Sequence, residues 1–189
     1  HTLHLRRTRI HLLPPELACC VALRDMNVVE NDMLEPPQCV IDSGVAVTMS
    51  YMSRIIESRR QGCARLDSFN LGVVPLAALA SYSLRSLELR RNGIAVIPHA
   101  VSLLTCLSEL SLSHNSIKFV PDELLYVSTL NVLSLDNNEI SSLPFAFGNL
   151  RRLQVLDLSH NNLQQLPISL GDVRGMVSLT IDGNPLAYT

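Results

Sequence analysis

The sequence predicts an α/β solenoid, a curved stack of about eight short repeats with a parallel sheet on its concave face and short helices or irregular turns on its convex face. Three observations lead to this fold class. One apolar pattern recurs every 23 residues, its leucines alternate with polar residues as in a strand, and an asparagine and a proline follow at fixed distances.

The repeat is clearest in the C-terminal two thirds of the chain. LELRRNGIAVIP from Leu87 aligns without a gap with LSLSHNSIKFVP from Leu110, LSLDNNEISSLP from Leu133 and LDLSHNNLQQLP from Leu156. LTIDGNPL from Leu179 continues the series, and ARLDSFNLGVVP from Ala64 begins it, with Phe69 in the place of the asparagine. Six units therefore stand in one register.

Each row of the alignment has its own physical meaning. The period-two spacing of Leu87 and Leu89, repeated in every unit, indicates a short strand with one buried face. The asparagine stands where the strand ends and the chain turns inward, and its amide can both donate to and accept from backbone groups that lack water. Proline closes the inward leg because it has no amide hydrogen to satisfy. The two rows are Asn92, Asn115, Asn138, Asn161 and Asn184, and Pro98, Pro121, Pro144 and Pro167.

These residues match the leucine-rich repeat. The 23-residue length and the Leu-Pro or Val-Pro ending resemble the intracellular Ras-group type found in small-GTPase and phosphatase scaffolds. The resemblance implies a non-catalytic interaction module or scaffold in intracellular signalling, with another protein as partner, a small GTPase or a phosphatase among the possibilities.

The N-terminal third carries the same template with an interruption. LHLRRTRIHLLP from Leu3, with Thr8 in the asparagine place, and MNVVENDMLEPP from Met26 are 23 residues apart, but 38 residues separate Met26 from Ala64. Within the extra length, Val45, Met49, Met52 and Ile56 recur at helical spacing before Gly62, which predicts a helix from about 45 to 60.

The chain is accordingly divided into three segments. Residues 1–37 are the end of a first array of about two repeats, 38–63 are an exit segment and connecting helix, and 64–189 are a second array of six units with the last one truncated. Whether 38–63 breaks the solenoid or continues it is left open.

Function is expected on the concave face, because side chains that alternate with the buried leucines must project there. Arginines gather toward the N-terminal end of this face and acidic residues toward the other, so we expect it to bind a partner of complementary charge. The predicted partner-binding residues are Arg65, Asp67, Glu88, Arg90, Arg91, Ser111, Ser113, His114, Ser134, Asp136, Asn137, Asp157, Ser159, His160 and Asp182.

Other classes of function are disfavoured by composition and spacing. A formal net charge of −2 lacks the basic excess of nucleic-acid binders. The longest apolar stretches, such as 71–80, are about ten residues where a membrane span needs about 20. Ser113, His114 and Asp157 supply the residue types of a hydrolase triad, but the Gly-x-Ser-x-Gly elbow is missing. We therefore predict no catalytic residues, no cofactor and no metal.

The setting and the extent of the protein are separate questions. Five cysteines at Cys19, Cys20, Cys39, Cys63 and Cys106, an odd and unclustered set, favour a reducing, cytoplasmic location. An alternative function is the recognition or regulatory segment of a larger enzyme, such as a repeat-bearing kinase or GTPase, whose catalytic part lies elsewhere. The start at His1 and the final Asn184-Pro185-Leu186 leave open whether the chain is a fragment. The partner's identity, the pathway and the oligomeric state are not readable from the sequence.

Overall fold

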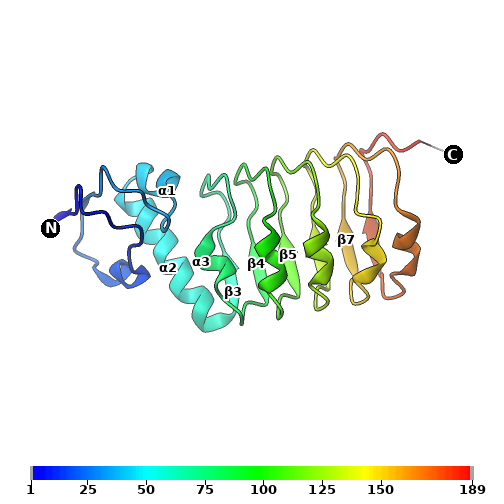
Figure 1. Cartoon of the computed structure of the whole chain (residues 1–189), viewed down its shortest axis with the longest axis horizontal. Helices are drawn as coiled ribbons and strands as arrows, with labels where there is room; N and C mark the ends of the chain where they lie inside the picture. The colour runs from blue at the N-terminus through cyan, green and yellow to red at the C-terminus, as the bar shows by residue number, and fades with distance from the viewer. Residues whose placement is uncertain (1, 188–189) are drawn as a thin grey trace.

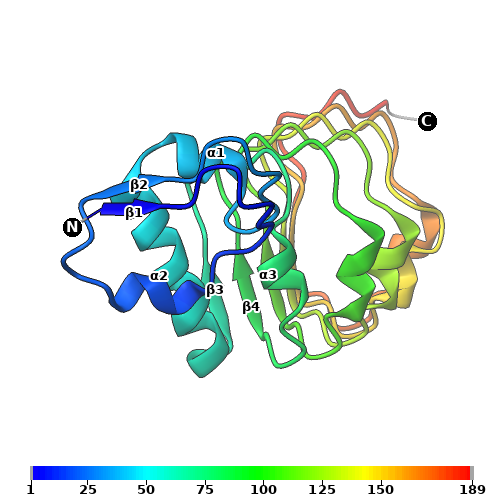
Figure 2. The same cartoon turned by 60° about the vertical axis from the view of Figure 1, so that its left-hand side comes forward.

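The computed structural model describes residues 2–187, so residues 1, 188 and 189, at the outer ends of the first and third predicted segments, lie outside it. Within the described residues the coils stack side by side along the long axis of the molecule (Figure 1). The strands form one side of the stack, and the short helices lie on the opposite side of each coil (Figure 2). The predicted α/β solenoid is confirmed.

Two parallel sheets are present within residues 2–187. β1 (Thr2–His4) pairs with β2 (Asp25–Asn27), and a six-stranded sheet follows in sequence order. Its strands are β3 (Cys63–Arg65), β4 (Ser86–Glu88), β5 (Glu109–Ser111), β6 (Val132–Ser134), β7 (Val155–Asp157) and β8 (Ser178–Thr180). Leu87 lies opposite Leu110, Leu110 opposite Leu133, and Leu133 opposite Leu156, so the observed register is the 23-residue repeat itself.

The return segments on the other side are single short helical turns. They are the 3₁₀ helices η1 (Pro15–Cys19), η2 (His99–Leu103), η3 (Asp122–Tyr126), η4 (Phe147–Asn149) and η5 (Ile168–Asp172), and the α-helix α3 (Leu76–Leu79). In most of them a proline immediately precedes the turn in extended conformation, as Pro121 does before η3. Proline ends the inward leg and leaves the first turn with one orphan N–H fewer.

The asparagine row works as a ladder between neighbouring coils. The Nδ2 of Asn138 donates to the carbonyl oxygen of Leu112 one repeat earlier (3.0 Å), and its Oδ1 accepts from the backbone N–H of Ile117 (3.0 Å). Asn161 repeats the pattern with Leu135 and Ile140. One side chain thus satisfies backbone donors and acceptors that the turn has removed from water.

The connecting segment forms α1 (Gln38–Asp42) and α2 (Val45–Gln61), which confirms the helix predicted from about 45 to 60. The predicted apolar face of that helix was wrong in part. Of the four residues expected to be buried, Val45, Met49, Met52 and Ile56, only Met52 is fully buried. The buried side chains are Thr48, Tyr51, Met52, Ile55 and Ser58. The face is wider and rotated because α2 packs between η1 on one side and β3 on the other.

Phe69 shows why the first unit of the second array departs from the repeat. At this position the other units use the amide to reach the carbonyl of the preceding coil, but here α2 precedes the coil. Phe69 instead packs edge-to-face on Tyr51 of α2, with ring centroids 5.6 Å apart. An aromatic ring replaces an amide because the neighbour is an apolar helix face.

Candidate functional site on the sheet face

The candidate site is built from residues that leave the strands of the six-stranded sheet. The two alternating apolar positions of the strand point into the core, as Leu133 and Leu135 do with no exposed surface. The residue between them and the one after the second leucine, Ser134 and Asp136 in this coil, therefore face outward. The stacking of coils brings the same positions of neighbouring repeats next to each other.

The outward residues that come one position later in each repeat are directed by a different feature of the backbone. They are Arg91, His114, Asn137 and His160, and all have φ between 53° and 55°, in the left-handed region. Simple strand alternation would turn each of these side chains away from the residue just before it, but the chain has already left the strand at this point. The left-handed turn decides their direction, which strand alternation alone could not predict.

Nine side chains surround a hollow of about 530 Å³ on this face. Eight of them were predicted partner-binding residues, and Ser68 was not among those predictions. The lining residues are Asp67, Ser68, Arg90, Arg91, Ser113, His114, Ser134, Asp136 and Asp157. Ser68 occupies the same left-handed position as Arg91 and His114, with φ of 61°, and the repeat alignment places it at the same outward position of its unit.

At the basic end of the hollow the side chains are fixed by polar contacts. Arg90 donates from Nε to Ser111 Oγ (2.7 Å), and its backbone N–H donates to Asp67 Oδ1 (2.7 Å). Arg65 lies 3.5 Å from Glu88, measured between Nε and Oε1. Asp67 and Ser111 therefore position Arg90, whose guanidinium keeps further donors for a partner.

At the acidic end the carboxylates accept hydrogen bonds from neighbouring side chains. Asp136 accepts from the Ser113 hydroxyl and from Asn137 Nδ2 (2.9 Å). Burial alone would raise the pKa of Asp136, but the hydrogen bonds from Ser113 and Asn137 outweigh it and lower the pKa below its ordinary value. Asp157 accepts from Ser159 Oγ at 2.7 Å. Both carboxylates are held in one geometry by these hydrogen bonds.

The remaining predicted residues divide into supports and outliers. Ser111, Ser113 and Ser159 are almost fully buried, Ser113 to 3% exposure, so they hold neighbouring side chains and offer a partner little surface. Glu88, Asn137, His160 and Asp182 do not line the hollow, and Arg65 lies beyond its basic end. The structure thus brings together the central part of the predicted face.

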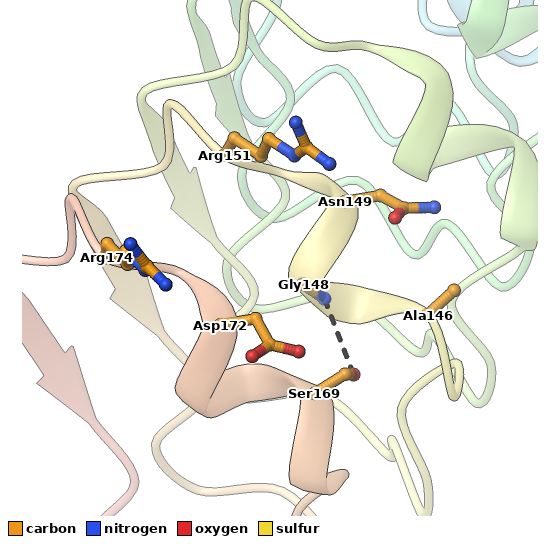
Figure 3. A pocket seen from close by; sticks show the side chains of 7 residues that line it. All are labelled: Ala146, Gly148, Asn149, Arg151, Ser169, Asp172 and Arg174. Atoms are coloured by element: carbon orange, nitrogen blue, oxygen red, sulfur yellow. Dashed lines mark hydrogen bonds between the residues drawn. The ribbon is translucent and has the colours of Figure 1, made fainter.

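A second hollow lies between η4 and η5, away from the sheet (Figure 3). Its volume is about 590 Å³, and its lining is Ala146, Gly148, Asn149, Arg151, Ser169, Asp172 and Arg174. Figure 3 shows the two arginines on neighbouring coils and the Gly148 N–H directed at Ser169 Oγ, 3.4 Å away. The sequence prediction did not include these residues.

Metal binding and membrane insertion are two further points on which the described residues give information. Among residues 2–187, no group of three or more His, Cys, Asp or Glu side chains is arranged to hold a metal ion. Over the same residues, no helix combines the length and the apolar character that crossing a membrane requires.

In the hollow, His114 Nε2 is 4.0 Å from Asp136 Oδ2, and the Ser113 hydroxyl donates to that same carboxylate.

A parallel-sheet solenoid with an open polar sheet face is the architecture of a protein-interaction module. The leucine-rich-repeat family model matches residues 82–140, 106–154 and 128–186, together more than half of the chain. This chain belongs to the leucine-rich-repeat family. No curated protein sequence matches it.

Solved structures give the same fold. A leucine-rich-repeat protein of Leptospira interrogans is 28% identical with a TM-score of 0.63, and the match covers 98% of this chain and 44% of that one. The ectodomain of the Arabidopsis thaliana receptor kinase GASSHO1/SCHENGEN3, solved with Casparian strip integrity factor 2, is 24% identical with a TM-score of 0.56 over 97% of this chain and 18% of that one. An internalin of Listeria monocytogenes is 17% identical, with a TM-score of 0.55 over 100% of this chain and 43% of that one. The chain spans less than half the length of each of these three proteins.

Proposed function

We propose that this chain is a non-catalytic protein-interaction module that binds another protein through the hollow on its sheet face. One observation carries the proposal. The hollow of about 530 Å³ has Arg90 and Arg91 toward one end and Asp136 and Asp157 toward the other. A partner with acidic and basic groups in the opposite order would be oriented along the sheet by this arrangement.

The contacts within the hollow favour binding over catalysis. A nucleophilic serine needs a base within hydrogen-bond reach of its hydroxyl. The group in reach of the Ser113 hydroxyl is Asp136, whose pKa is lowered and which is therefore a weak base, and burial to 3% exposure leaves the hydroxyl little access to a substrate. Ser113 therefore has a positioning role for the carboxylate. The mixed signs of charge also differ from the uniformly basic surface that nucleic acid selects.

An intracellular, cytoplasmic setting and a role as a signalling scaffold belong to the proposal. All five cysteines lie in the described part of the chain and are free, which is typical of proteins in a reducing compartment. The 23-residue repeat resembles that of small-GTPase and phosphatase scaffolds, and a small GTPase or a phosphatase is the partner that this resemblance suggests.

We also propose that the chain divides into residues 1–37, 38–63 and 64–189, on the grounds of strand pairing and helix packing. β1 and β2 pair only with each other, and α2 stands between them and β3. The segment 38–63 therefore interrupts the sheet, while α2 continues the packing of the core.

A second candidate function is the recognition segment of a larger enzyme. The observation that favours it is the likeness to the GASSHO1/SCHENGEN3 ectodomain, which belongs to a receptor kinase and of which this chain spans only 18%. The complete open reading frame would decide, because a kinase or GTPase domain in the same frame would support this candidate.

The binding proposal is tested by protein capture from lysate of the source cell. The wild type is compared with Asp136→Arg/Asp157→Arg, which reverses the acidic end of the hollow. The matched control is Asp122→Arg/Asp172→Arg, which makes the same charge change at exposed positions on the opposite side of the coils. Circular dichroism first confirms that all three proteins fold.

We expect mass spectrometry to identify a protein that the wild type and the control capture and the sheet-face variant loses. Equal capture by all three proteins would place recognition elsewhere. Loss of capture in the control alone would place it on the opposite side of the coils.

A further inference from the structure

A separate cavity lies at the joint between the two arrays. Its volume is about 460 Å³, and it is bounded by α2, by α3 and by the inward legs of the two N-terminal repeats, residues 12–15 and 35–36. Figures 1 and 2 both draw α2 close to α3. No residue of the sheet-face hollow takes part in it.

The walls of the cavity are mainly hydrocarbon. Tyr51, Met52 and Ile55 line it from one face of α2, and Leu12 and Leu76 also belong to its lining. Leu12 is 62% exposed and Leu76 is 53% exposed, so apolar surface of the lining is open to solvent. Sites for small ligands are typically concave, mostly apolar and supplied with a few polar groups.

The lining departs from the regular repeat at two places. Ala80 lines the cavity just after α3, whereas the residue 23 positions later is Leu103, which is 52% exposed. The other wall is α2, a helix of 17 residues, where the regular coils have a single short turn.

One acidic group faces this apolar space. The Glu35 side chain is only 8% exposed, and it accepts hydrogen bonds from Tyr51 Oη (2.9 Å) and from the backbone N–H of Ala77 (2.8 Å). Both donors are neutral. Arg59, the cationic residue of the cavity lining, pairs with Glu16 instead, with 3.7 Å between Nη1 and Oε1.

A carboxylate buried without a cation is costly, because its charge is removed from water without compensation. Burial accordingly raises the pKa of Glu35 above its ordinary value, against the opposing effect of the backbone N–H of Ala77, the Tyr51 hydroxyl and the backbone N–H of Leu76. A carboxylate has about four lone-pair directions. These neutral donors do not use all of them, so the carboxylate keeps room for a further donor, and a positive one would compensate its charge.

We propose that this cavity binds a small apolar molecule that carries one protonated amine, with the ammonium group on Glu35 and the hydrocarbon between α2, α3 and Leu12. An anion would be repelled by Glu35. A neutral alcohol would fill the same space without compensating the charge. This site is independent of the proposed binding of a protein on the sheet face.

The probes are 2-phenylethylamine and 2-phenylethanol, which have similar shape and differ in charge. Their dissociation constants are measured by titration calorimetry at pH 7, and NMR follows the backbone amide of Ala77. We expect the amine to bind the wild type about ten-fold or more tightly than the alcohol, as a charge-assisted hydrogen bond would give. Equal affinities, or no binding of either probe, would overturn the proposal.

Three variants locate the effect. Glu35→Gln keeps a hydrogen-bonding side chain without the charge and should reduce the preference for the amine to near one. Ala80→Leu adds bulk at an exposed position of the cavity lining, leaves Glu35 in place, and should weaken the binding of both probes. Glu57→Gln removes one negative charge at an exposed position of α2 that does not line the cavity, and it should change neither affinity.

The proposal can be tested even if Glu35→Gln is poorly folded. The comparison of the two probes on the wild type and the measurement on Ala80→Leu do not depend on that variant. Unchanged amine binding by Ala80→Leu would place the amine outside the cavity. Retention of the amine preference by a folded Glu35→Gln would exclude Glu35 as the group that holds it.

Discussion

At the scale of single residues, the asparagine ladder and the buried carboxylate show two ways in which a polar group becomes part of the core. Asn138 repeats a solution used in coil after coil, with its amide shared between two backbone segments. Glu35 occurs once and connects α2 to α3 through Tyr51 and Ala77. The first can be predicted from the period of the sequence, whereas the second depends on a joint that has no period.

Replacement of Asn138 by alanine should destabilise the protein by about 1–3 kcal/mol, because buried backbone groups of neighbouring coils would lose their partners. The control is Asn162→Ala, at an exposed position, which should change the free energy of unfolding by less than about 0.5 kcal/mol. Urea unfolding followed by circular dichroism measures both. A cost at Asn138 no greater than that at Asn162 would contradict the role of the ladder.

The pH dependence of stability should report Glu35. Burial raises its pKa, so the folded state holds a proton more firmly than the unfolded state does. The contribution of Glu35 is therefore fully present below the ordinary carboxyl pKa and is lost as the pH rises through the raised pKa. Urea unfolding from about pH 4 to pH 8 should show the wild type losing stability relative to Glu35→Gln. A difference that does not change over this range would contradict the prediction.

At the scale of elements, α2 determines how the second array begins. It ends at Gly62, whose φ of 71° is in the left-handed region, and a Cβ added there would lie 3.2 Å from the carbonyl oxygen of Ser83. The chain passes directly from this glycine into β3, so the helix end and the first strand of the sheet are fixed together. The six coils that follow can then repeat one register.

Gly62→Ala should cost about 1–2 kcal/mol, because an L side chain in the left-handed region is strained and the Ser83 carbonyl limits relaxation. Gly171→Ala is the control, since Gly171 has no positive φ and a Cβ there would meet nothing within 4 Å. Thermal unfolding should give a clearly lower melting temperature for Gly62→Ala only. Equal melting temperatures for the two variants would show that the helix end tolerates a side chain.

At the scale of the whole molecule, stability is expected to be uneven along the stack, because each coil is stabilised by the coils on either side of it. The interior coils bury the leucines of β4 to β7 almost completely. The β1–β2 pair has mostly exposed or half-buried strand residues. The last coil is also open. Leu179 is 38% exposed, although the leucines at the same repeat position in the preceding coils are buried.

Native-state hydrogen exchange should therefore show the slowest backbone amides in β5 to β7 and faster exchange in β1 and β2. The measurement is the exchange rate of the amides that bond between strands, such as Leu112 and Leu135 against Leu5. Uniform protection from residue 2 to residue 187 would indicate that the two arrays open together as one unit.

The predictable part of the site follows from the repeat. The 23-residue period assigned the buried leucines, the asparagines and the outward positions, and the stacking then placed Arg90, Arg91, Asp136 and Asp157 around one hollow. Their polar contacts could not be read in advance. The hydrogen bond between Ser113 and Asp136 joins two coils, and its formation depends on side-chain directions set by the left-handed turn after each strand.

The solenoid, its register and the helix of the connecting segment follow from the sequence alone, because each results from a local period that a single chain displays. The buried face of α2, the aromatic ring at Phe69 and the position of Glu35 beside an apolar cavity depend on contacts between distant segments. These features arise where two arrays meet, and at such a joint no neighbouring copy exists whose contacts the sequence could repeat.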